Sequence, residues 1–348
     1  MKAGVLYAKD DIRYADWPDF TPGAGMVKVR MRVCGICGSD LPRVLGDAAH
    51  FYPVILGHEF AGEVVEVGEG VETIKVGDRV AGAPLMPCLK CEDCQKGNYA
   101  LCRHYGFVGS RQPGAFAEYV ELPERNAIVF NENVTFEQGA LFEPATVALH
   151  GLFQADFRGA TDVAVLGGGN IGILAMQWAN ILGARSVTVF DIDDDRLALA
   201  SRLGAANTIN TKDSDYLEQA MALTNGRGFD FVFETAGQPV TIKMGFDLTA
   251  GKGTFCCIGT PTRPVEFSAE LWEKMNRREF KVTGSWMSYS APFPGREWTL
   301  TAHYFGTGEL RLEDSMVFKR TPLANIADAF DMYRIPGAVK GKILLTND

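Results

Sequence analysis

The chain of 348 residues is 47% hydrophobic and 22% charged, and its 34 Lys and Arg against 43 Asp and Glu give a net charge of −9. The composition is ordinary for a globular protein, and the length predicts two domains because single cores seldom grow beyond about 250–300 residues. The acidic balance argues against nucleic acid or an anionic membrane as the main partner. No apolar run approaches the roughly 18 residues of a membrane span.

The first residues and the cysteine content set an expectation for the compartment. The N-terminus carries acids early and lacks the apolar core of a signal peptide, so we expect a cytoplasmic, reducing environment. There, eight cysteines are expected to be metal ligands or buried thiols rather than disulfides.

Residues 1 to about 145 are predicted to be rich in β-strands. VKVRMRV (27–33) alternates, the segment 63–85 has short apolar runs punctuated by glycine, and FAEYVEL (116–122) is another candidate strand. Many short strands separated by Gly and Pro predict a small barrel or sandwich.

After about residue 150, apolar strands alternate with helical patterns. The expected strands are TDVAVLG (161–167), SVTVFDID (186–193), FDFVFETAG (229–237) and GTFCCIG (253–259), and helical spacing runs through 171–184 and 196–205. This order predicts βαβ units and a parallel sheet. The pattern is mixed again from about 281 and ends in the strand KGKILLT (340–346). We expect a β-rich domain from residues 1–148 and 286–348, with an α/β domain at 149–285 inserted.

A glycine-rich turn predicts the cofactor site. Gly167, Gly169 and Gly172 stand in GxGxxG register between a strand and a helix, and Asp191 ends the next strand. The turn, which also holds Asn170 and Ile171, would let the backbone approach a pyrophosphate, and Asp191 would bind the ribose hydroxyls and repel a 2′-phosphate. This favours NAD over NADP. The alternatives are glycines used only for packing and an Asp191 that is one more surface acid beside 193–195.

Four cysteines in a Pro/Gly-rich loop predict a structural zinc site. Their spacing is Cx2Cx2Cx7C, and four soft thiolates this close suit a closed tetrahedral zinc. The loop has few large apolar residues, so the metal would supply its order. An iron–sulfur cluster or disulfides are the alternatives. The residues are Cys88, Cys91, Cys94 and Cys102.

A second, looser set could hold a catalytic zinc, which takes three protein ligands and leaves one position open. Cys37, His58 and Glu59 could supply the three, and Glu143 could be a displaceable fourth ligand or hold the bound water. His58 could instead be a buried structural histidine. Cys34 forms a CxxC pair with Cys37, but it has no such partners and is expected to point into the core.

The motifs together resemble those of the zinc-dependent medium-chain dehydrogenases. GICGSD, GHEFAGEVVEVGEGV, VGDRV, the four-cysteine loop, GAFAEY, EP at 143–144 and GGGNIG occur in the family's order over nearly the whole chain. The resemblance implies a GroES-like β-rich catalytic domain plus a Rossmann doubly wound parallel sheet. It also implies two zinc ions per chain, NAD, and a homo-oligomer, either a dimer or a tetramer. GHE followed by Glu143 resembles the polyol branch, which includes sorbitol dehydrogenase.

The same resemblance implies roles for individual residues. Cys37, His58, Glu59 and Glu143 would belong to the catalytic zinc, with Glu59 also counted as catalytic, and Ser39 would pass the substrate's proton outward. Pro42 stands where many alcohol dehydrogenases of the family have a histidine, which leaves His50 or bulk water to take that proton. Lys342 and Arg196 match positions near the cofactor pyrophosphate and the adenosine ribose, although both could be solvated charges.

A narrower resemblance, carried by CGSDLPR, GSR at 109–111 and GSWMSYSAPFPGREW, points to dehydrogenases of polyol phosphates. It implies that a polyol or polyol phosphate is oxidised to a ketose, with Arg43 and Arg111 holding the phosphate unless they are ordinary surface arginines. A dehydrogenase for another secondary alcohol, such as sorbitol, butanediol or threonine, is the alternative within enzymes. A non-catalytic NAD-binding protein on this fold is the alternative of another class.

Overall fold

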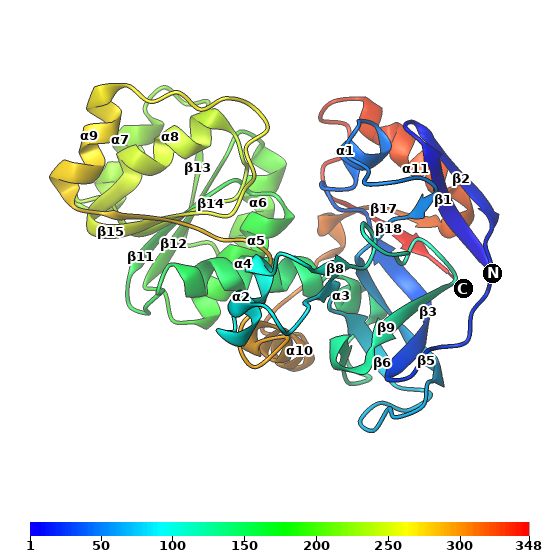
Figure 1. The fold of residues 1–348 in the computed structure, drawn as a ribbon. Helices are drawn as coiled ribbons and strands as arrows, with labels where there is room; N and C mark the ends of the chain where they lie inside the picture. The colour runs from blue at the N-terminus through cyan, green and yellow to red at the C-terminus, as the bar shows by residue number, and fades with distance from the viewer. Residues whose placement is uncertain (348) are drawn as a thin grey trace. The chain divides into compact units, whose positions relative to one another are not determined.

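A computed structural model describes residues 1–347 (Figure 1). The chain divides into two compact units. Unit 1 contains Met1–Glu143, Tyr289–Gly308 and the stretch from Leu312 onward, and unit 2 contains Pro144–Ser288 and Glu309–Arg311. Within residues 1–347, no helix has the length and apolar character needed to cross a bilayer.

The main sheet of unit 1 is built around the long strand β3 (Met26–Gly35). It pairs antiparallel with β5 (Glu59–Val67), β9 (Tyr119–Pro123) and the C-terminal β18 (Lys342–Thr346). β6 (Arg79–Gly82) and β10 (Ala127–Val129) extend the sheet beyond β5, and β17 (Val317–Pro322) extends it beyond β18. Both ends of the chain thus contribute to one sheet.

Smaller sheets and short helices complete unit 1. β1 (Lys2–Ala8) pairs with β2 (Asp11–Asp16) and β4 (Val54–Ile55), and β7 (Leu85–Met86) pairs with β8 (Gly106–Phe107). The helices include α1 (Leu41–Val44), α2 (Glu92–Gln95), α3 (Phe136–Ala140), α10 (Arg296–Thr307) and α11 (Ile326–Asp331). The expected strand 116–122 is only half formed, because Phe116 bonds with Leu56 and Gly4 before β9 begins.

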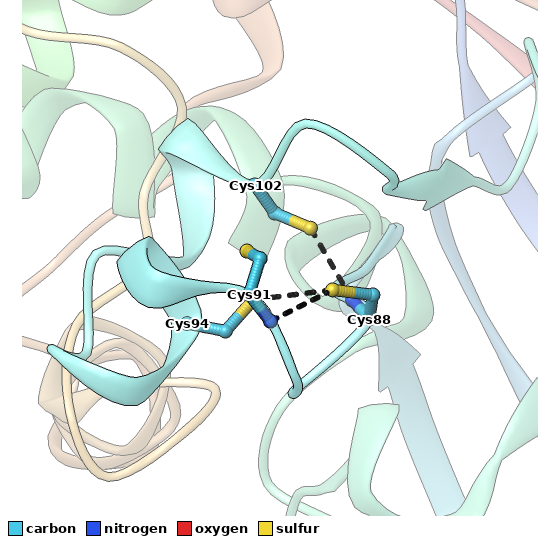
Figure 2. Close-up of side chains that lie close together, drawn as sticks. All are labelled: Cys88, Cys91, Cys94 and Cys102. Atoms are coloured by element: carbon cyan, nitrogen blue, oxygen red, sulfur yellow. Dashed lines mark hydrogen bonds between the residues drawn. The ribbon is translucent and has the colours of Figure 1, made fainter.

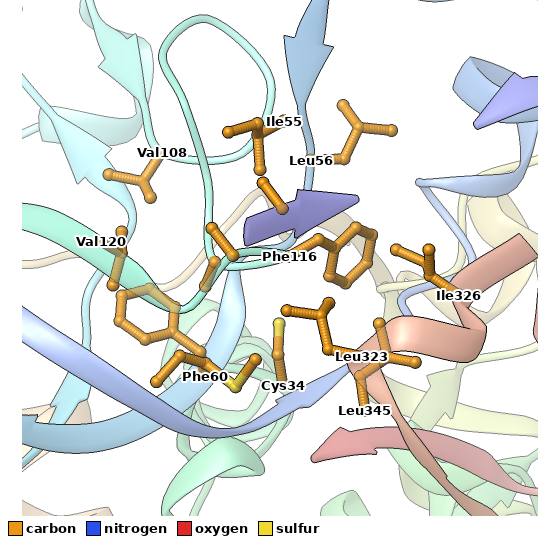
Figure 3. Close-up of a cluster of buried hydrophobic side chains, with 14 of the residues drawn as sticks. Cys34, Ile55, Leu56, Phe60, Val108, Phe116, Val120, Leu323, Ile326 and Leu345 are labelled. Carbon is orange, nitrogen blue, oxygen red and sulfur yellow. The ribbon is translucent and has the colours of Figure 1, made fainter. Parts of the chain in front are cut away.

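Apolar side chains from the N-terminal strands and the C-terminal segment of unit 1 form its largest core. Phe60, Phe116 and Phe330 are at most 1% exposed, and Phe116 meets Phe330 edge to face at 6.0 Å between ring centroids. Figure 3 shows the thiol of Cys34 inside this cluster, near Phe60, Phe116 and Leu323. Cys34 is fully buried, as predicted, and burial raises the pKa of its thiol well above the usual value.

Unit 2 is a six-stranded parallel sheet in the order β13-β12-β11-β14-β15-β16. Every residue of β11 (Asp162–Leu166) is buried, as expected for a parallel strand covered on both faces. The other strands are β12 (Ser186–Asp191), β13 (Asn207–Asn210), β14 (Phe229–Glu234), β15 (Thr249–Cys257) and β16 (Lys281–Gly284). All four strands predicted between residues 161 and 259 are present.

Helices connect these strands and supply the core of unit 2. α5 (Asn170–Ile181) and α6 (Asp194–Arg202) pack on β11, β12 and β13, whereas α8 (Pro239–Leu248) and α9 (Ala269–Arg278) pack on β14 and β15. α7 (Tyr216–Leu223) contacts β13 and α8. Phe246 of α8 lies among Phe255, Phe267 and Phe280, with ring centroids 4.9–5.7 Å away.

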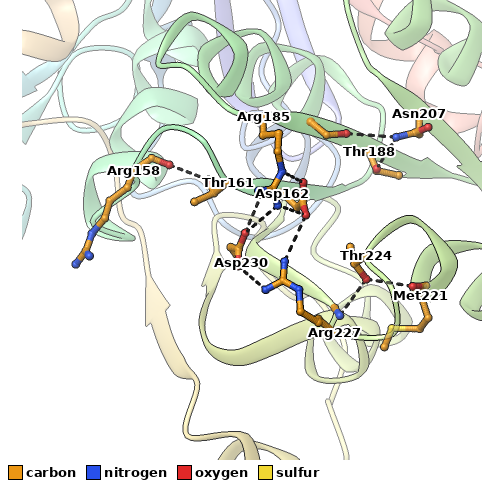
Figure 4. Close-up of polar contacts among 12 residues, drawn as sticks. Arg158, Thr161, Asp162, Arg185, Thr188, Asn207, Met221, Thr224, Arg227 and Asp230 are labelled. Carbon is orange, nitrogen blue, oxygen red and sulfur yellow. Dashed lines mark hydrogen bonds and ion pairs between the residues drawn. The ribbon is translucent and has the colours of Figure 1, made fainter.

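The amino-terminal edge of this sheet is tied by charged side chains (Figure 4). Arg185 donates to both carboxylate oxygens of Asp162, at 2.9 and 2.5 Å, and Asp230 accepts from the backbone N–H of Asp162 at 2.9 Å. Arg227 lies 3.6 Å from Asp162 and 3.8 Å from Asp230. The charges of two acids and two arginines neutralise each other here, so we assign the cluster a structural role, which is to hold the strand ends together.

Candidate active site and cofactor site

The pairing of β3 with β5 brings the second predicted metal set together. Gly35 lies opposite Glu59 in this register, so the turn after β3 carries Cys37 toward Glu59, the first residue of β5, and His58, which precedes it. Ligand atoms of Cys37, His58 and Glu59 all lie within 4.8 Å of one another. His58 and Glu59 are buried. A thiol, an imidazole and a carboxylate fit a zinc ion that keeps one open position.

Asp40 is a member of this site that the sequence analysis missed. Its carboxylate is fully buried, accepts from the backbone N–H of Cys37 at 3.1 Å, and lies 3.5 Å from Nδ1 of His58. A carboxylate beside one ring nitrogen orients a histidine so that the other nitrogen faces a metal. The sequence does contain a signal for Asp40, because GSD follows Cys37 directly and an acid beside a metal-binding histidine is a common arrangement.

Lys342 lies against the same cluster rather than in solvent. It is 7% exposed, and its Nζ donates to both oxygens of Glu59, at 2.8 and 2.5 Å. A Cβ on Gly35 would come within 2.5 Å of Glu59 Oε2, so glycine is needed there to leave room for the ion pair. Because Lys342 is buried, it is not the solvated surface charge that was the alternative. Its contact with the cofactor stays a prediction.

Glu143 is the fourth residue predicted for the catalytic zinc. It lies in the first turn of α4 (Phe142–Gln154). Burial, opposed by the charge of His58, raises the pKa of its carboxyl to about 7. Its carboxylate is not among the ligand atoms that converge within 4.8 Å. This placement is compatible with the predicted role of holding a metal-bound water.

The four-cysteine loop forms a closed site (Figure 2). Ligand atoms of Cys88, Cys91, Cys94 and Cys102 all lie within 4.8 Å of one another. Cys88 Sγ accepts from the backbone N–H of Cys91 at 3.4 Å, and N–H groups of Lys90 and Cys91 lower the pKa of its thiol to about 6. A thiolate is therefore favoured at neutral pH. Four convergent sulfurs fit the tetrahedral zinc that the spacing predicts.

The glycine-rich turn of unit 2 leads from β11 into α5. Gly167 has φ +107°, a conformation that suits glycine, and a Cβ on Gly172 would collide with the carbonyl oxygen of Gly167. Gly169 is the N-cap of α5, so Asn170 and Ile171 form the first turn, where free N–H groups favour an anion.

Asp191, at the end of β12, is already tied to this turn. Its Oδ2 accepts from the backbone N–H of Gly168 at 2.6 Å, and its Oδ1 accepts from Ile192 and Asp193. Arg196 reaches 3.6 Å from the same carboxylate. Asp191 is buried rather than one more surface acid, so it can hold the turn in place and still present a negative charge there.

The remaining predicted residues, Ser39, Arg43 and Arg111, all belong to unit 1. Ser39 is exposed, and its backbone N–H lies 3.5 Å from Cys37 Sγ. Arg43 donates to the carbonyl oxygen of Ser39, and its buried Nε has no hydrogen-bond partner among residues 1–347. Arg111 is exposed and lies over the ring of Tyr105, 4.5 Å from its centroid.

Known families match both parts of the chain. Residues 23–132 match the alcohol dehydrogenase GroES-like domain, and residues 170–302 match the zinc-binding dehydrogenases. A relative that is 38% identical over 92% of the chain extends the match to nearly the full length. The chain therefore belongs to the zinc-dependent medium-chain alcohol dehydrogenases. It is an oxidoreductase that uses zinc and a nicotinamide dinucleotide, and the predicted GroES-like and Rossmann folds are confirmed.

That relative is galactitol 1-phosphate 5-dehydrogenase of Escherichia coli (strain K12), matched over 320 residues and 92% of its own length. The crystal structure of galactitol-1-phosphate dehydrogenase from Escherichia coli is similar with a TM-score of 0.94 and 36% identity, and each chain is covered completely. A putative zinc-binding dehydrogenase from Sinorhizobium meliloti 1021, bound to NADP, matches with a TM-score of 0.90 and 32% identity over 99% of each chain.

Proposed function

We propose that this protein oxidises a secondary alcohol of a polyol phosphate to a ketose phosphate with NAD as hydride acceptor. The observation that carries the substrate class is the pair of arginines near His50, one of which, Arg43, contacts the loop after Cys37. Burial lowers the pKa of His50, and the charges of Arg111 and Arg43 lower it further, so both arginines lie near enough to His50 for their charges to affect it. The similarity to a galactitol 1-phosphate dehydrogenase supports the same substrate class.

Arg43 is the better placed of the two arginines. Its Nη1 is held by the carbonyl oxygen of Ser39, two residues after Cys37, and its Nε keeps a free donor in a buried position. Leaving such a donor without a partner is costly, and a phosphate oxygen would satisfy it. Arg111 lies on Tyr105 and can add a second guanidinium.

The reaction follows from the donor set and from the residues around it. Zinc held by Cys37, His58 and Glu59 would lower the pKa of the substrate hydroxyl, so that the carbinol hydrogen can leave as hydride to NAD. Asp40 would fix the imidazole of His58, and Lys342 the carboxylate of Glu59. Ser39 would take the hydroxyl proton, and because Ser39 is exposed, bulk water can receive that proton without a second histidine.

The preference for NAD over NADP is part of the proposal. A 2′-phosphate would have to lie beside the buried carboxylate of Asp191, which also accepts three backbone N–H groups and so cannot easily turn away. The negative charges of the phosphate and of the Asp191 carboxylate would repel each other. Direct binding titrations with NADH and NADPH would check this preference, and equal dissociation constants would contradict it.

We also propose a homo-oligomer in a reducing cytoplasmic compartment. The free thiols of two zinc-ligand sets support such a compartment, since thiolates bind metal only when they are not oxidised. Light scattering of the purified protein would give the oligomeric state.

The substrate class is tested with matched pairs of polyols and their phosphates. We expect a far higher kcat/KM for a polyol phosphate such as galactitol 1-phosphate than for galactitol, since charged hydrogen bonds contribute about 1.5–3 kcal/mol each. Arg43→Ala and Arg111→Ala should raise KM for the phosphate about 10- to 100-fold and leave KM for the free polyol unchanged. Arg13→Ala, which removes an exposed arginine paired with Asp11, is the control. Equal kcat/KM for both members of a pair would overturn the phosphate assignment.

A further inference from the structure

The carboxyl end of β14 carries two polar residues that belong neither to the zinc-ligand sets nor to the glycine-rich turn. Glu234 ends β14, and Thr235 begins the turn after it. The carboxyl edge of a parallel sheet is where such folds bind nucleotides, and the glycine-rich turn after β11 leaves the same edge, since β11 and β14 are neighbours. Both residues therefore lie beside the proposed dinucleotide site.

Glu234 holds its own turn closed from inside the protein. Its side chain is fully buried, and Oε1 accepts from Ala236 N–H at 2.9 Å, Gly237 N–H at 2.8 Å and the Thr241 hydroxyl at 2.7 Å. Oε2 has no hydrogen-bond partner among the described residues. A carboxyl oxygen that accepts from three donors fixes the path of the turn. Burying a carboxyl group costs free energy, and these hydrogen bonds offset part of that cost.

Thr235 joins this turn to the glycine-rich turn. Its Oγ1 lies 3.0 Å from the carbonyl oxygen of Leu166 and 3.2 Å from that of Gly167, and its backbone N–H donates to Leu166 at 3.0 Å. A Cβ on Gly167 would lie 3.0 Å from this hydroxyl, and one on Gly172 would lie 2.9 Å from it. The hydroxyl thus occupies the space that the first and third glycines of the motif leave open.

We propose that Thr235 and Glu234 are positioning residues for the nicotinamide dinucleotide, acting through the glycine-rich turn and not by contact with the cofactor. Thr235 holds the carbonyl groups of Leu166 and Gly167, so that the N–H groups that follow them stay aimed outward before the cofactor binds. Glu234 holds Thr235 in place. A turn that is already ordered loses less entropy on binding, and this raises affinity. The inference rests on the dinucleotide site of the proposed function and adds the residues that shape it.

The first test compares Thr235→Val with Thr235→Ser in the full-length, zinc-loaded protein. Valine keeps the shape and removes the hydroxyl, so we expect the Kd for NADH, measured by fluorescence titration, to rise about tenfold. Serine keeps the hydroxyl and should stay within about twofold of the wild type. Amide hydrogen exchange at 166–172 should be faster in the valine variant alone. An unchanged Kd in Thr235→Val, or an equal loss in Thr235→Ser, would overturn the inference.

The second test separates positioning from general stability. Glu234→Ala should raise the Kd for NADH about tenfold and Glu234→Gln should recover most of the affinity, because an amide oxygen can accept the same N–H groups. Asp230→Asn is the matched control: it lies on the same strand at the opposite edge, where it should lower Tm and leave the Kd unchanged. A Kd that rises equally in the control would overturn the inference.

The binding readout also separates this inference from the substrate proposal. If no polyol phosphate is oxidised but Thr235→Val still weakens NADH binding, the substrate class is wrong and the positioning role stands. If polyol phosphates are oxidised and Thr235→Val binds NADH like the wild type, only the positioning role is wrong. A wild-type protein that bound neither NADH nor NADPH would overturn this inference together with the proposed cofactor site.

Discussion

Asp40 and Lys342 are charged residues that hold the ligands of the Cys37, His58 and Glu59 cluster in position. Asp40 lies beside the imidazole of His58, and Lys342 donates to both oxygens of Glu59. All four of the charged or titratable side chains involved are less than 9% exposed, so each needs its partner, since an isolated buried charge would be expensive. The ligands are thus held in position by their neighbours.

Asp40→Asn should weaken the catalytic zinc site without removing the structural one. The amide oxygen can still accept from Cys37 N–H, but the negative charge beside His58 is lost, and loss of such a partner typically costs 10- to 100-fold in metal affinity. Zinc analysis after dialysis against a moderate chelator should give one ion per chain in the variant and two in the wild type. Asp47→Asn, which alters an exposed acid of the following loop, should retain both ions. Two tightly held ions in Asp40→Asn would contradict this role.

The two cysteines of the CxxC pair should respond differently to replacement. Cys37→Ala removes a ligand and should leave one zinc per chain, whereas Cys34→Ala should keep both ions and lower the free energy of unfolding by about 1 kcal/mol through a small cavity. Metal analysis and urea unfolding of the two variants would show this. Loss of zinc in Cys34→Ala would mean that the buried thiol takes part in the metal site.

Strand pairing decides which of the predicted residues meet. Cys37 and His58 are 21 positions apart in the chain, and the antiparallel register of β3 and β5 brings the segments that carry them together. β18 lies on the other side of β3 and carries Lys342 to the same place from the far end of the chain. The spacing of residues in the sequence was enough to identify candidate ligands. It could not reveal the Lys342–Glu59 pair, because this contact depends on which strands are neighbours.

The β15 strand has two thiols that should make the free energy of unfolding depend on pH. Burial raises the pKa of Cys256 to about 12 and that of Cys257 to about 11. In the unfolded chain these thiols would ionise near pH 8.5. Above this pH the unfolded state releases protons that the folded state retains, so the free energy of unfolding should fall as the pH rises, by up to about 1.4 kcal/mol per pH unit for each thiol.

Urea unfolding at pH 8 and pH 10 would measure this effect. Replacing Cys256 and Cys257 by alanine should reduce the difference between the two pH values, because the other titrating groups remain the same in both proteins. A double variant with the same pH dependence as the wild type would show that these thiols ionise normally.

At the scale of the whole molecule, each unit has a hydrophobic core of its own, and the zinc loop belongs to unit 1. The loop packs on the Pro/Gly-rich segment 289–295 of the same unit. Tyr99 meets Phe293 edge to face at 5.2 Å, and a Cβ on Gly97 would lie 2.7 Å from that of Ala291. The metal would therefore order two segments that are distant in sequence.

Removal of zinc should loosen both of these segments and spare unit 2. After exhaustive chelation we expect faster amide exchange at 88–102 and at 289–295, because the loop has little apolar packing without its metal. Exchange in β11 and β14 should stay slow. Cys94→Ser should reproduce the change at both segments. Equal loosening of β11 and β14 would contradict the independence of the two cores.

The sequence alone determined the features that depend on local chemistry: the alternation of strands and helices, the glycine-rich turn, and the cysteine spacing. Each of these features depends on residues that are close together in the chain, so the periodicity of a strand or helix and the spacing of ligands are visible in the sequence itself. Only the tertiary structure decided that Asp40 lies beside His58, that Lys342 is paired with Glu59, and that Thr235 fills the space between Gly167 and Gly172. These contacts join separate strands, and their formation depends on sheet order and register, which the spacing of residues along one chain does not specify.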